Sequence, residues 1–168
     1  MKSIKIVSKM LHGMESCDLY KKDSRGNNII VKLKKNPPTN IEDIGTVERQ
    51  IKLLIPKQYI EFLLFSNGME LYNYDNIDGL KLLSLQEIEM YTAYSRNTFE
   101  EDWQDNILIF GKIIGEDNYL GFKIYEEYYE IVDCYFEQLP SEWETIDGTF
   151  DGFLTKYLTG NGNKYWIS

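Results

Sequence analysis

Histidine and cysteine, the residues that build most zinc sites, are nearly absent from this sequence. Its 168 residues contain one histidine, His12, and two cysteines, Cys17 and Cys134, which are far apart in the chain. A zinc site needs closely spaced His and Cys ligands, and a disulfide framework needs several cysteines. The sequence therefore predicts no metal site and no disulfide framework. Two reduced thiols are typical of a cytoplasmic protein.

The motifs of the common catalytic and cofactor sites are missing as well. A Ser-His-Asp or Cys-His arrangement would have to use His12, and nothing near it suggests activation. The chain has no Walker A loop and no G-x-G-x-x-G after a predicted strand. Asp75 and Asp78 do not follow the EF-hand spacing. The pairs Glu116-Asp117 and Glu126-Glu127 are most simply exposed acids at turns. We therefore predict no enzyme, no catalytic residue and no cofactor.

Long apolar runs are also lacking. Nothing approaches the ~20 apolar residues of a membrane span, and the apolar stretches of residues 1–16 are too short for a signal-peptide core. We expect a soluble, cytoplasmic protein with no membrane partner. Alanine occurs once, at Ala93, which disfavours long ideal helices. Aromatic residues are abundant instead, with 13 Tyr, 8 Phe and 3 Trp, and they favour sheets and contact surfaces.

Positive charge is scarce after the first 35 residues. Residues 1–35 hold nine basic and three acidic residues, a balance of +6, whereas residues 36–168 hold nine basic and 24 acidic residues, a balance of −15. An acidic body repels phosphates, which argues against nucleic acid as a partner. It attracts basic proteins and speeds encounter with them. Keeping the surface soluble is the simpler explanation of the same acidity.

Turn residues and apolar spacing predict alternating elements in the first half. We expect a helix over residues 3–12, a hairpin with strands Asp18–Tyr20 and Ile29–Leu33, and a break at Asn36-Pro37-Pro38. The pattern Thr39-Asn40-Ile41-Glu42 predicts a capping box for a helix that runs from Ile41 to Leu54. A second helix, buried on most sides, lies between Pro56 and Asn67-Gly68. Residues 72–79 read as a polar turn, followed by a strand at Leu80–Leu83 and a helix at Leu85–Tyr94.

The second half reads mostly as sheet. Strands are predicted at residues 106–111, 118–125 and 128–136, the last two joined near Glu126-Glu127. A final helix, Phe150–Leu158, is capped by Thr149 and stopped by Gly160, and the tail docks through Trp166. Because helices and strands are largely segregated, we predict an α+β fold rather than a doubly wound parallel sheet.

Several of these landmarks together resemble the SUKH superfamily, which includes the fungal Smi/Knr cell-wall regulators and many bacterial immunity proteins. The family pattern is a helix bearing Glu, then Leu-Pro, Tyr, Phe-Leu and Asn-Gly. In this sequence the corresponding residues are Glu48, Ile55-Pro56, Tyr59, Phe62-Leu63 and Asn67-Gly68. Ile107–Gly111 resembles the central strand of the family, and Thr149–Leu154 resembles its closing helix. Ile55 departs from the usual Leu, and Met69 replaces a second Gly.

The resemblance covers roughly residues 40–158. It divides the chain into a basic helix and hairpin extension, residues 1–35, and a SUKH-like α+β domain, residues 36–168. It implies a single domain with a mostly antiparallel or mixed central sheet flanked by helices. The oligomeric state stays open.

The resemblance also implies that the function is binding. Many bacterial members are thought to neutralise toxin domains, often nucleases, by direct contact, which agrees with the acidic charge. We expect a basic toxin domain as the protein partner. The predicted partner-binding residues are Tyr72, Tyr74, Asp75, Glu116, Asp117, Tyr125, Glu126, Glu127, Tyr128 and Tyr129. The alternative is a regulatory or scaffolding module that binds a cellular protein.

Overall fold

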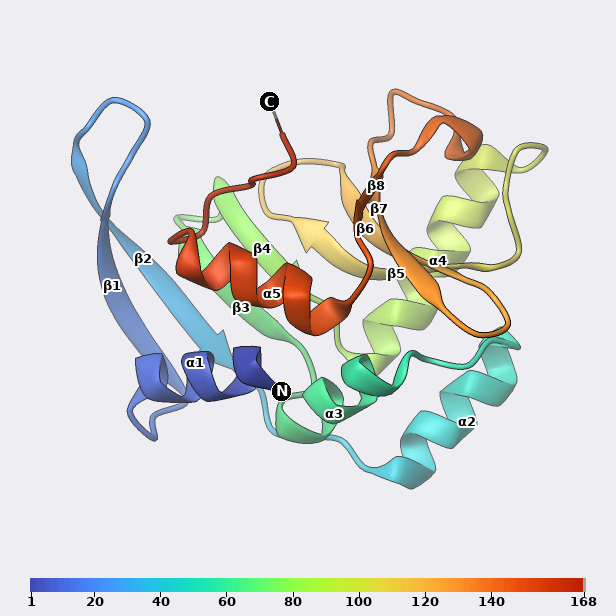
Figure 1. Ribbon diagram of the computed structural model, residues 1–168, viewed down its shortest axis with the longest axis horizontal. Helices are drawn as coiled ribbons and strands as arrows, with labels where there is room; N and C mark the ends of the chain where they lie inside the picture. Colours follow the sequence, from blue (N-terminus) through green and yellow to red (C-terminus); the bar gives the residue numbers. More distant parts are fainter. Residues whose placement is uncertain (168) are drawn as a thin grey trace.

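Each strand of the protein pairs with its neighbours in sequence, so that the chain builds one antiparallel sheet of eight strands in the order β1 to β8 (Figure 1). The computed structural model describes residues 1–167. The strands are β1 Ser16–Lys22, β2 Asn28–Lys35, β3 Met69–Tyr74, β4 Asp78–Leu82, β5 Ile107–Ile113, β6 Tyr119–Ile124, β7 Tyr129–Cys134 and β8 Thr145–Asp147. The predicted single α+β domain is thereby confirmed.

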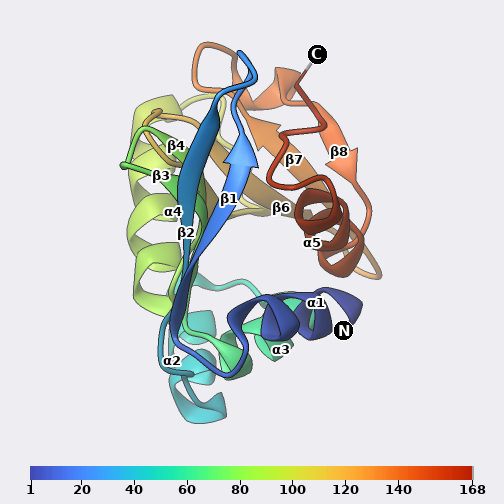
Figure 2. The same cartoon turned by 90° about the vertical axis from the view of Figure 1, so that its left-hand side faces the viewer.

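Helices cover both faces of the sheet. They are α1 Lys2–Leu11, α2 Ile41–Ile51, α3 Lys57–Phe65, α4 Leu85–Phe99 and α5 Phe150–Thr159, with a short 3₁₀ turn at Pro140–Glu142. Figure 2 shows α1, α3 and α5 against one face of the sheet and α4 against the other. The protein therefore has three layers, with α2 placed at one end of the molecule.

The core is built around Tyr59 of α3, which is fully buried. Its ring lies 4.9 Å from that of Phe150 and 5.5 Å from those of Phe110 and Phe122, centroid to centroid. Such edge-to-face contacts suit aromatic rings. The Tyr59 hydroxyl donates a hydrogen bond of 2.7 Å to the carbonyl oxygen of Leu83. The apolar helix between Pro56 and Asn67-Gly68 thus connects the sheet to α5.

Replacing Tyr59 with phenylalanine should lower the free energy of unfolding by about 1–3 kcal/mol, because the buried Leu83 carbonyl would lose its hydroxyl donor. Urea unfolding of both proteins measures the difference. Tyr128→Phe is the matched control, since Tyr128 is exposed and its loss of a hydroxyl should stay within about 0.5 kcal/mol. Equal midpoints for the Tyr59 variant and the wild type would contradict the assigned role.

The predicted capping box of α2 is wrong by one residue. The N-cap is Asn40 rather than Thr39, and the Asn40 side-chain oxygen accepts a hydrogen bond of 2.9 Å from the backbone N–H of Asp43. Asn is as good a cap as Asp or Ser and better than Thr. The helix also ends earlier than Leu54, because Lys52 adopts a left-handed conformation with φ 58°.

Two further differences concern the strands and α4. Residues 72–79, expected to be a polar turn, include the last residues of β3 and the first residues of β4, and neither β3 nor the short β8 was predicted. Tyr72 has φ 51° and lies where the β3–β4 register shifts, and such a bulge hides the alternation that reveals a strand. Helix α4 continues past Tyr94 to Phe99. The Phe99 ring packs edge-on against those of Phe136 and Trp143, which are distant in sequence.

Residues 1–35 share the core with the rest of the chain. They form α1, β1 and β2, and β2 pairs with β3 through Lys32 opposite Asn73 and Lys34 opposite Glu70. The first turn of α1 is bound by Asp151 of α5, whose carboxylate accepts hydrogen bonds from the backbone N–H and the hydroxyl of Ser3 at 2.9 and 2.6 Å. A carboxylate at a helix N-terminus is favourable. These contacts tie the basic segment to the acidic body.

Candidate partner-binding surface

Nine of the ten residues predicted to bind a partner lie in or next to connections at two opposite ends of the sheet, and Tyr72 lies within β3. Asp75, Glu116 and Asp117 belong to the β3–β4 and β5–β6 connections and Tyr74 ends β3, whereas residues 125–128 form the β6–β7 connection and Tyr129 begins β7; the two groups of connections lie at opposite ends of the sheet (Figure 1). Successive connections of an antiparallel meander alternate between the two ends of the strands. The structure therefore does not bring the ten residues into one patch.

Tyr72 belongs to the core. Its side chain is 2% exposed, and its hydroxyl donates a hydrogen bond of 3.0 Å to the Leu158 carbonyl oxygen. Gly162 lies so close to the Tyr72 ring that an added Cβ would be 2.5 Å from it. Burial raises the pKa of Tyr72 to about 12. Its ring fastens α5 and the C-terminal segment to β3, and a partner could not reach it in this structure.

The β6–β7 connection presents two stacked tyrosines. The rings of Tyr125 and Tyr128 lie 4.6 Å apart with an interplanar angle of 18°, and Glu126 and Glu127 are exposed beside them. Tyr129 has an internal contact, because its hydroxyl oxygen accepts a hydrogen bond of 2.8 Å from the backbone N–H of Phe150 at the start of α5. This end thus offers a single small hairpin with two aromatic rings and two acids.

At the other end, three connections bring together a larger set of acids, which we name the acidic rim. Its members are Asp75, Asp78, Glu116, Asp117, Asp133, Glu137 and Glu144. Lys164 joins the first two connections, with Nζ 2.9 Å from Asp78 Oδ1 and 3.3 Å from Glu116 Oε1. Burial by itself would raise the pKa of Asp78, but the hydrogen bond and charge of Lys164 outweigh it and hold this pKa below its usual value. Four members, Asp78, Asp133, Glu137 and Glu144, were not among the predicted residues.

Hydrogen bonds orient the carboxylates of the β5–β6 connection. Asp117 accepts one of 2.6 Å from the Tyr119 hydroxyl and one of 3.2 Å from the Tyr94 hydroxyl. Glu116 accepts one of 2.9 Å from the side-chain amide of Asn118. A carboxylate that is already oriented loses little conformational entropy when a cation binds to it. This part of the rim is therefore prepared for a cationic partner.

Apolar and aromatic side chains accompany the acids of the rim. Ile77 is 65% exposed, and Tyr94, Tyr135 and Ile167 are exposed as well. A hollow of ≈ 440 Å³ lies between the strand ends and the C-terminal segment, lined among others by Glu116, Asp133, Tyr135, Glu144 and Trp166. Tyr and Trp are enriched among the residues that anchor protein interfaces. The rim thus combines negative charge with exposed apolar and aromatic side chains that a partner could contact.

Asp133 is the acid of this set whose ionised form is most disfavoured. Burial, together with the negative charges of Glu116 and Glu144, raises its pKa to about 6, although Lys164 opposes the rise. An ionised Asp133 is therefore costly in the free protein at neutral pH. A cation that approached the hollow would relieve this cost.

Asp133→Asn should stabilise the protein above pH 6 by roughly 1 kcal/mol, after allowance for solvent screening of a half-exposed group. The folded-state pKa exceeds the unfolded one, so the cost of Asp133 is absent below about pH 4, grows from pH 4 to 6 and is complete above pH 6. Thermal unfolding between pH 4 and 8 tests this. Asp75→Asn, on an exposed loop, is the control. A stabilisation that is the same at every pH would refute the electrostatic cause.

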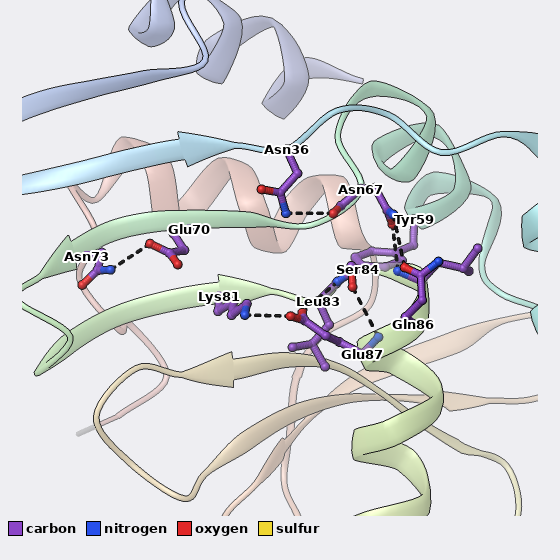
Figure 3. Close-up of polar contacts among 11 residues, drawn as sticks. Asn36, Tyr59, Asn67, Glu70, Asn73, Lys81, Leu83, Ser84, Gln86 and Glu87 are labelled. Atoms are coloured by element: carbon purple, nitrogen blue, oxygen red, sulfur yellow. Dashed lines mark hydrogen bonds and ion pairs between the residues drawn. The ribbon is translucent and has the colours of Figure 1, made fainter.

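Two residues of the sequence motif, Tyr59 and Asn67, take part in a network of polar contacts that connects α3, the strands and α4 (Figure 3). The Asn67 side-chain oxygen accepts a hydrogen bond of 2.8 Å from the backbone N–H of Leu85, and Asn36 donates one of 3.0 Å to the Asn67 carbonyl. Ser84 and Glu87 form a capping box at the start of α4. These contacts connect β2, the α3–β3 loop and α4. The motif therefore stabilises the fold and exposes no reactive group.

Searches for other kinds of site gave no candidate. Within residues 1–167, no group of three or more His, Cys, Asp or Glu residues could hold a metal ion. In the same part of the chain, no helix has the length and apolar character needed to cross a membrane.

Comparison with known proteins gave one family and two relatives. The sequence profile of the SMI1 / KNR4 family (SUKH-1) matches residues 38–156. The uncharacterized protein YnaB of Bacillus subtilis (strain 168) is 25% identical over 138 residues, which cover 77% of this chain and 83% of YnaB. The uncharacterized protein YobM of the same strain is 27% identical over 131 residues, which cover 75% of this chain and 69% of YobM. The profile match begins after β2 and ends within α5.

Proposed function

Because this chain belongs to the SMI1 / KNR4 family (SUKH-1), we propose that it is a binding protein that neutralises a basic toxin domain with its acidic rim. The observation that supports this most is the convergence of seven carboxylates, five from three connections and two from the adjoining ends of β4 and β7, on one end of the sheet. Exposed acids scattered for solubility would have no reason to gather there, nor to be accompanied by Ile77, Tyr94 and Tyr135. The proposed role requires no chemical step by this chain.

The rim would act by occupying the surface that the toxin needs for its substrate. A nuclease meets phosphates through Lys and Arg side chains, and carboxylates spaced along three connections can pair with those cations. Opposite charges also accelerate the encounter of the two proteins. Tyr94 and Tyr135, which contribute rigid rings, would bury apolar area at the same interface. The nucleic acid substrate would then be kept from the toxin surface both by repulsion from the carboxylates of the rim and by the space that this chain occupies.

The proposal is tested with the tagged full-length chain as bait in an extract of the producing cell. We expect it to retain a basic protein whose expression alone stops growth, and whose toxicity disappears on co-expression of this chain. Retention should fall steeply as salt rises from roughly 0.05 to 0.5 M, because exposed charge pairs are screened. Toxicity that persists on co-expression would refute the proposal, and binding that is insensitive to salt would refute the role of the rim.

A second candidate function is a regulatory or scaffolding module that binds a cellular protein. The observation that favours it is the stacked pair Tyr125 and Tyr128 at the end of the sheet opposite the rim, where Tyr128 is 58% exposed. The neighbouring genes distinguish the two functions. A gene for a large secreted multidomain protein beside this one favours toxin neutralisation, whereas an isolated gene favours regulation.

A further inference from the structure

The outer edge of β1 carries a row of backbone groups without partners. The N–H of Lys35 donates to the Glu15 carbonyl at 2.7 Å, and the N–H of Asp23 donates to the Asn27 carbonyl at 2.9 Å. With the uninterrupted β1–β2 register, these bonds show that odd-numbered β1 residues bond to β2. The N–H and C=O groups of Ser16, Asp18, Tyr20 and Lys22 therefore point outward. Within residues 1–167 they have no hydrogen-bond partner.

This edge carries the charged residues Asp18, Lys21 and Lys22, but it lacks the other features that usually protect a sheet edge from further pairing, which are short length, proline, a bulge and a covering element. Strand β1 has seven residues, contains no proline and pairs with β2 without a bulge. The opposite edge is formed by β8, which has only three residues and an irregular register. Figures 1 and 2 place β1 at the outer limit of the molecule. A long, regular and uncovered edge is a template for another strand.

The side chains of the edge are complementary to themselves. On the solvent side of the hairpin, Tyr20 is 78% exposed and lies directly opposite Ile30, which is 53% exposed. Asp18 lies opposite Lys32, and Lys22 lies opposite Asn28. Asp18 and Lys22, the neighbours of Tyr20 within the outward row, thus carry opposite charges at equal distances from Tyr20. Independently of the function proposed above, we infer that β1 pairs antiparallel with β1 of a second copy, about a two-fold axis at Tyr20.

The charges select this register over two nearby alternatives. An axis at Asp18 would place two carboxylates opposite one another, which is unfavourable. An axis at Leu19 would place Asp18 opposite Tyr20 and Ser16 opposite Lys22, leaving the charges unmatched. An axis at Tyr20 places Asp18 of each copy opposite Lys22 of the other, which gives two equivalent pairs of opposite charge. It also forms an apolar row of Ile30 and Tyr20 from both copies, so that each Asp18 lies between Lys32 of its own chain and Lys22 of the second.

Charge reversal provides the first test, by sedimentation equilibrium at about 0.15 M salt and concentrations up to roughly 0.5 mM. The wild type should approach twice its monomer mass of 19.8 kDa. Asp18→Lys and Lys22→Asp should each weaken association by on the order of tenfold or more, since each places two pairs of like charges across the axis. An equimolar mixture of the two variants should associate again, because both of its pairs are then opposite in charge.

Cysteine cross-linking provides the second test, in a Cys17→Ser background. Residues directly opposite in a hydrogen-bonded pair have Cα atoms about 5.5 Å apart, a distance that a disulfide spans. Tyr20→Cys should therefore form a covalent dimer on mild oxidation. Ile30→Cys, on the same face but about 14 Å from its own mate across three strand spacings, should not.

A wild-type protein that is monomeric over the whole concentration range would overturn the inference. The free edge of β1 would then be available only to a strand of a different protein. A mixture of the charge variants that fails to associate, or equal cross-linking at positions 20 and 30, would overturn the register.

Discussion

Removing residues 1–35 should leave a chain that does not fold. The deletion takes away α1, β1 and β2, together with four core side chains, Val7, Leu11, Val31 and Leu33, each at most 2% exposed. Burial of such a side chain is worth about 1.5–3 kcal/mol, so that four of them account for at least roughly 6 kcal/mol. The whole stability of a domain is about 5–15 kcal/mol. The deletion would also expose the edge of β3 and release Asp151 from Ser3.

Circular dichroism and urea unfolding of the truncated chain measure this effect. Single substitutions in β2 test the same contribution with a smaller expected loss of stability, since neighbouring residues of the strand face opposite sides of the sheet. Leu33→Ala, which empties a buried site, should cost about 2–5 kcal/mol, whereas Lys34→Ala on the exposed face should stay within about 0.5 kcal/mol. A truncated chain with an unchanged unfolding midpoint would show instead that residues 1–35 are a dispensable arm.

If the proposed function is correct, reversing two charges of the acidic rim should abolish toxin neutralisation. Asp75→Lys combined with Glu144→Lys changes two exposed side chains from different connections, and neither takes part in a hydrogen bond or ion pair within residues 1–167. Each new lysine would face a cationic partner, and like charges across an interface cost several kcal/mol. We expect the affinity for the toxin domain to fall by about 100-fold or more, and growth rescue to be lost.

The matched control is Glu126→Lys combined with Glu127→Lys on the β6–β7 connection. Both double variants replace two acids by two lysines and change the net charge from −9 to −5. They therefore share any effect of overall charge and differ only in the end of the sheet that is altered. Titration calorimetry with the toxin domain, together with the growth assay, compares them. If the control loses binding and the rim variant keeps it, the partner binds at the β6–β7 connection.

Local patterns were enough to predict most of the elements. Pro56 and Asn67-Gly68 bracket α3, and Thr149 caps α5 because its hydroxyl oxygen accepts a hydrogen bond from the backbone N–H of Gly152. The tail docks as predicted, since the Trp166 ring lies 5.4 Å from that of Phe153. These signals act between residues a few positions apart, so a sequence displays them directly. The motif from Glu48 to Gly68 likewise identified the family. Two of its residues, Tyr59 and Asn67, form hydrogen bonds that connect α3 and the following loop to the β4–α4 segment.

The candidate surface depended on the tertiary structure. In an antiparallel meander, the end of the sheet at which a connection lies is decided by counting strands, and β3 was hidden by the left-handed conformation of Tyr72. The predicted patch combined residues of the β5–β6 and β6–β7 connections, although these lie at opposite ends of β6, and it omitted Asp133 and Glu144. The sequence by itself established an acidic, aromatic-rich chain without the common catalytic motifs, and the order of its predicted elements indicated an α+β fold. Which acids share one end was decided by strand order, because contacts between residues far apart in the chain leave no local trace in the sequence.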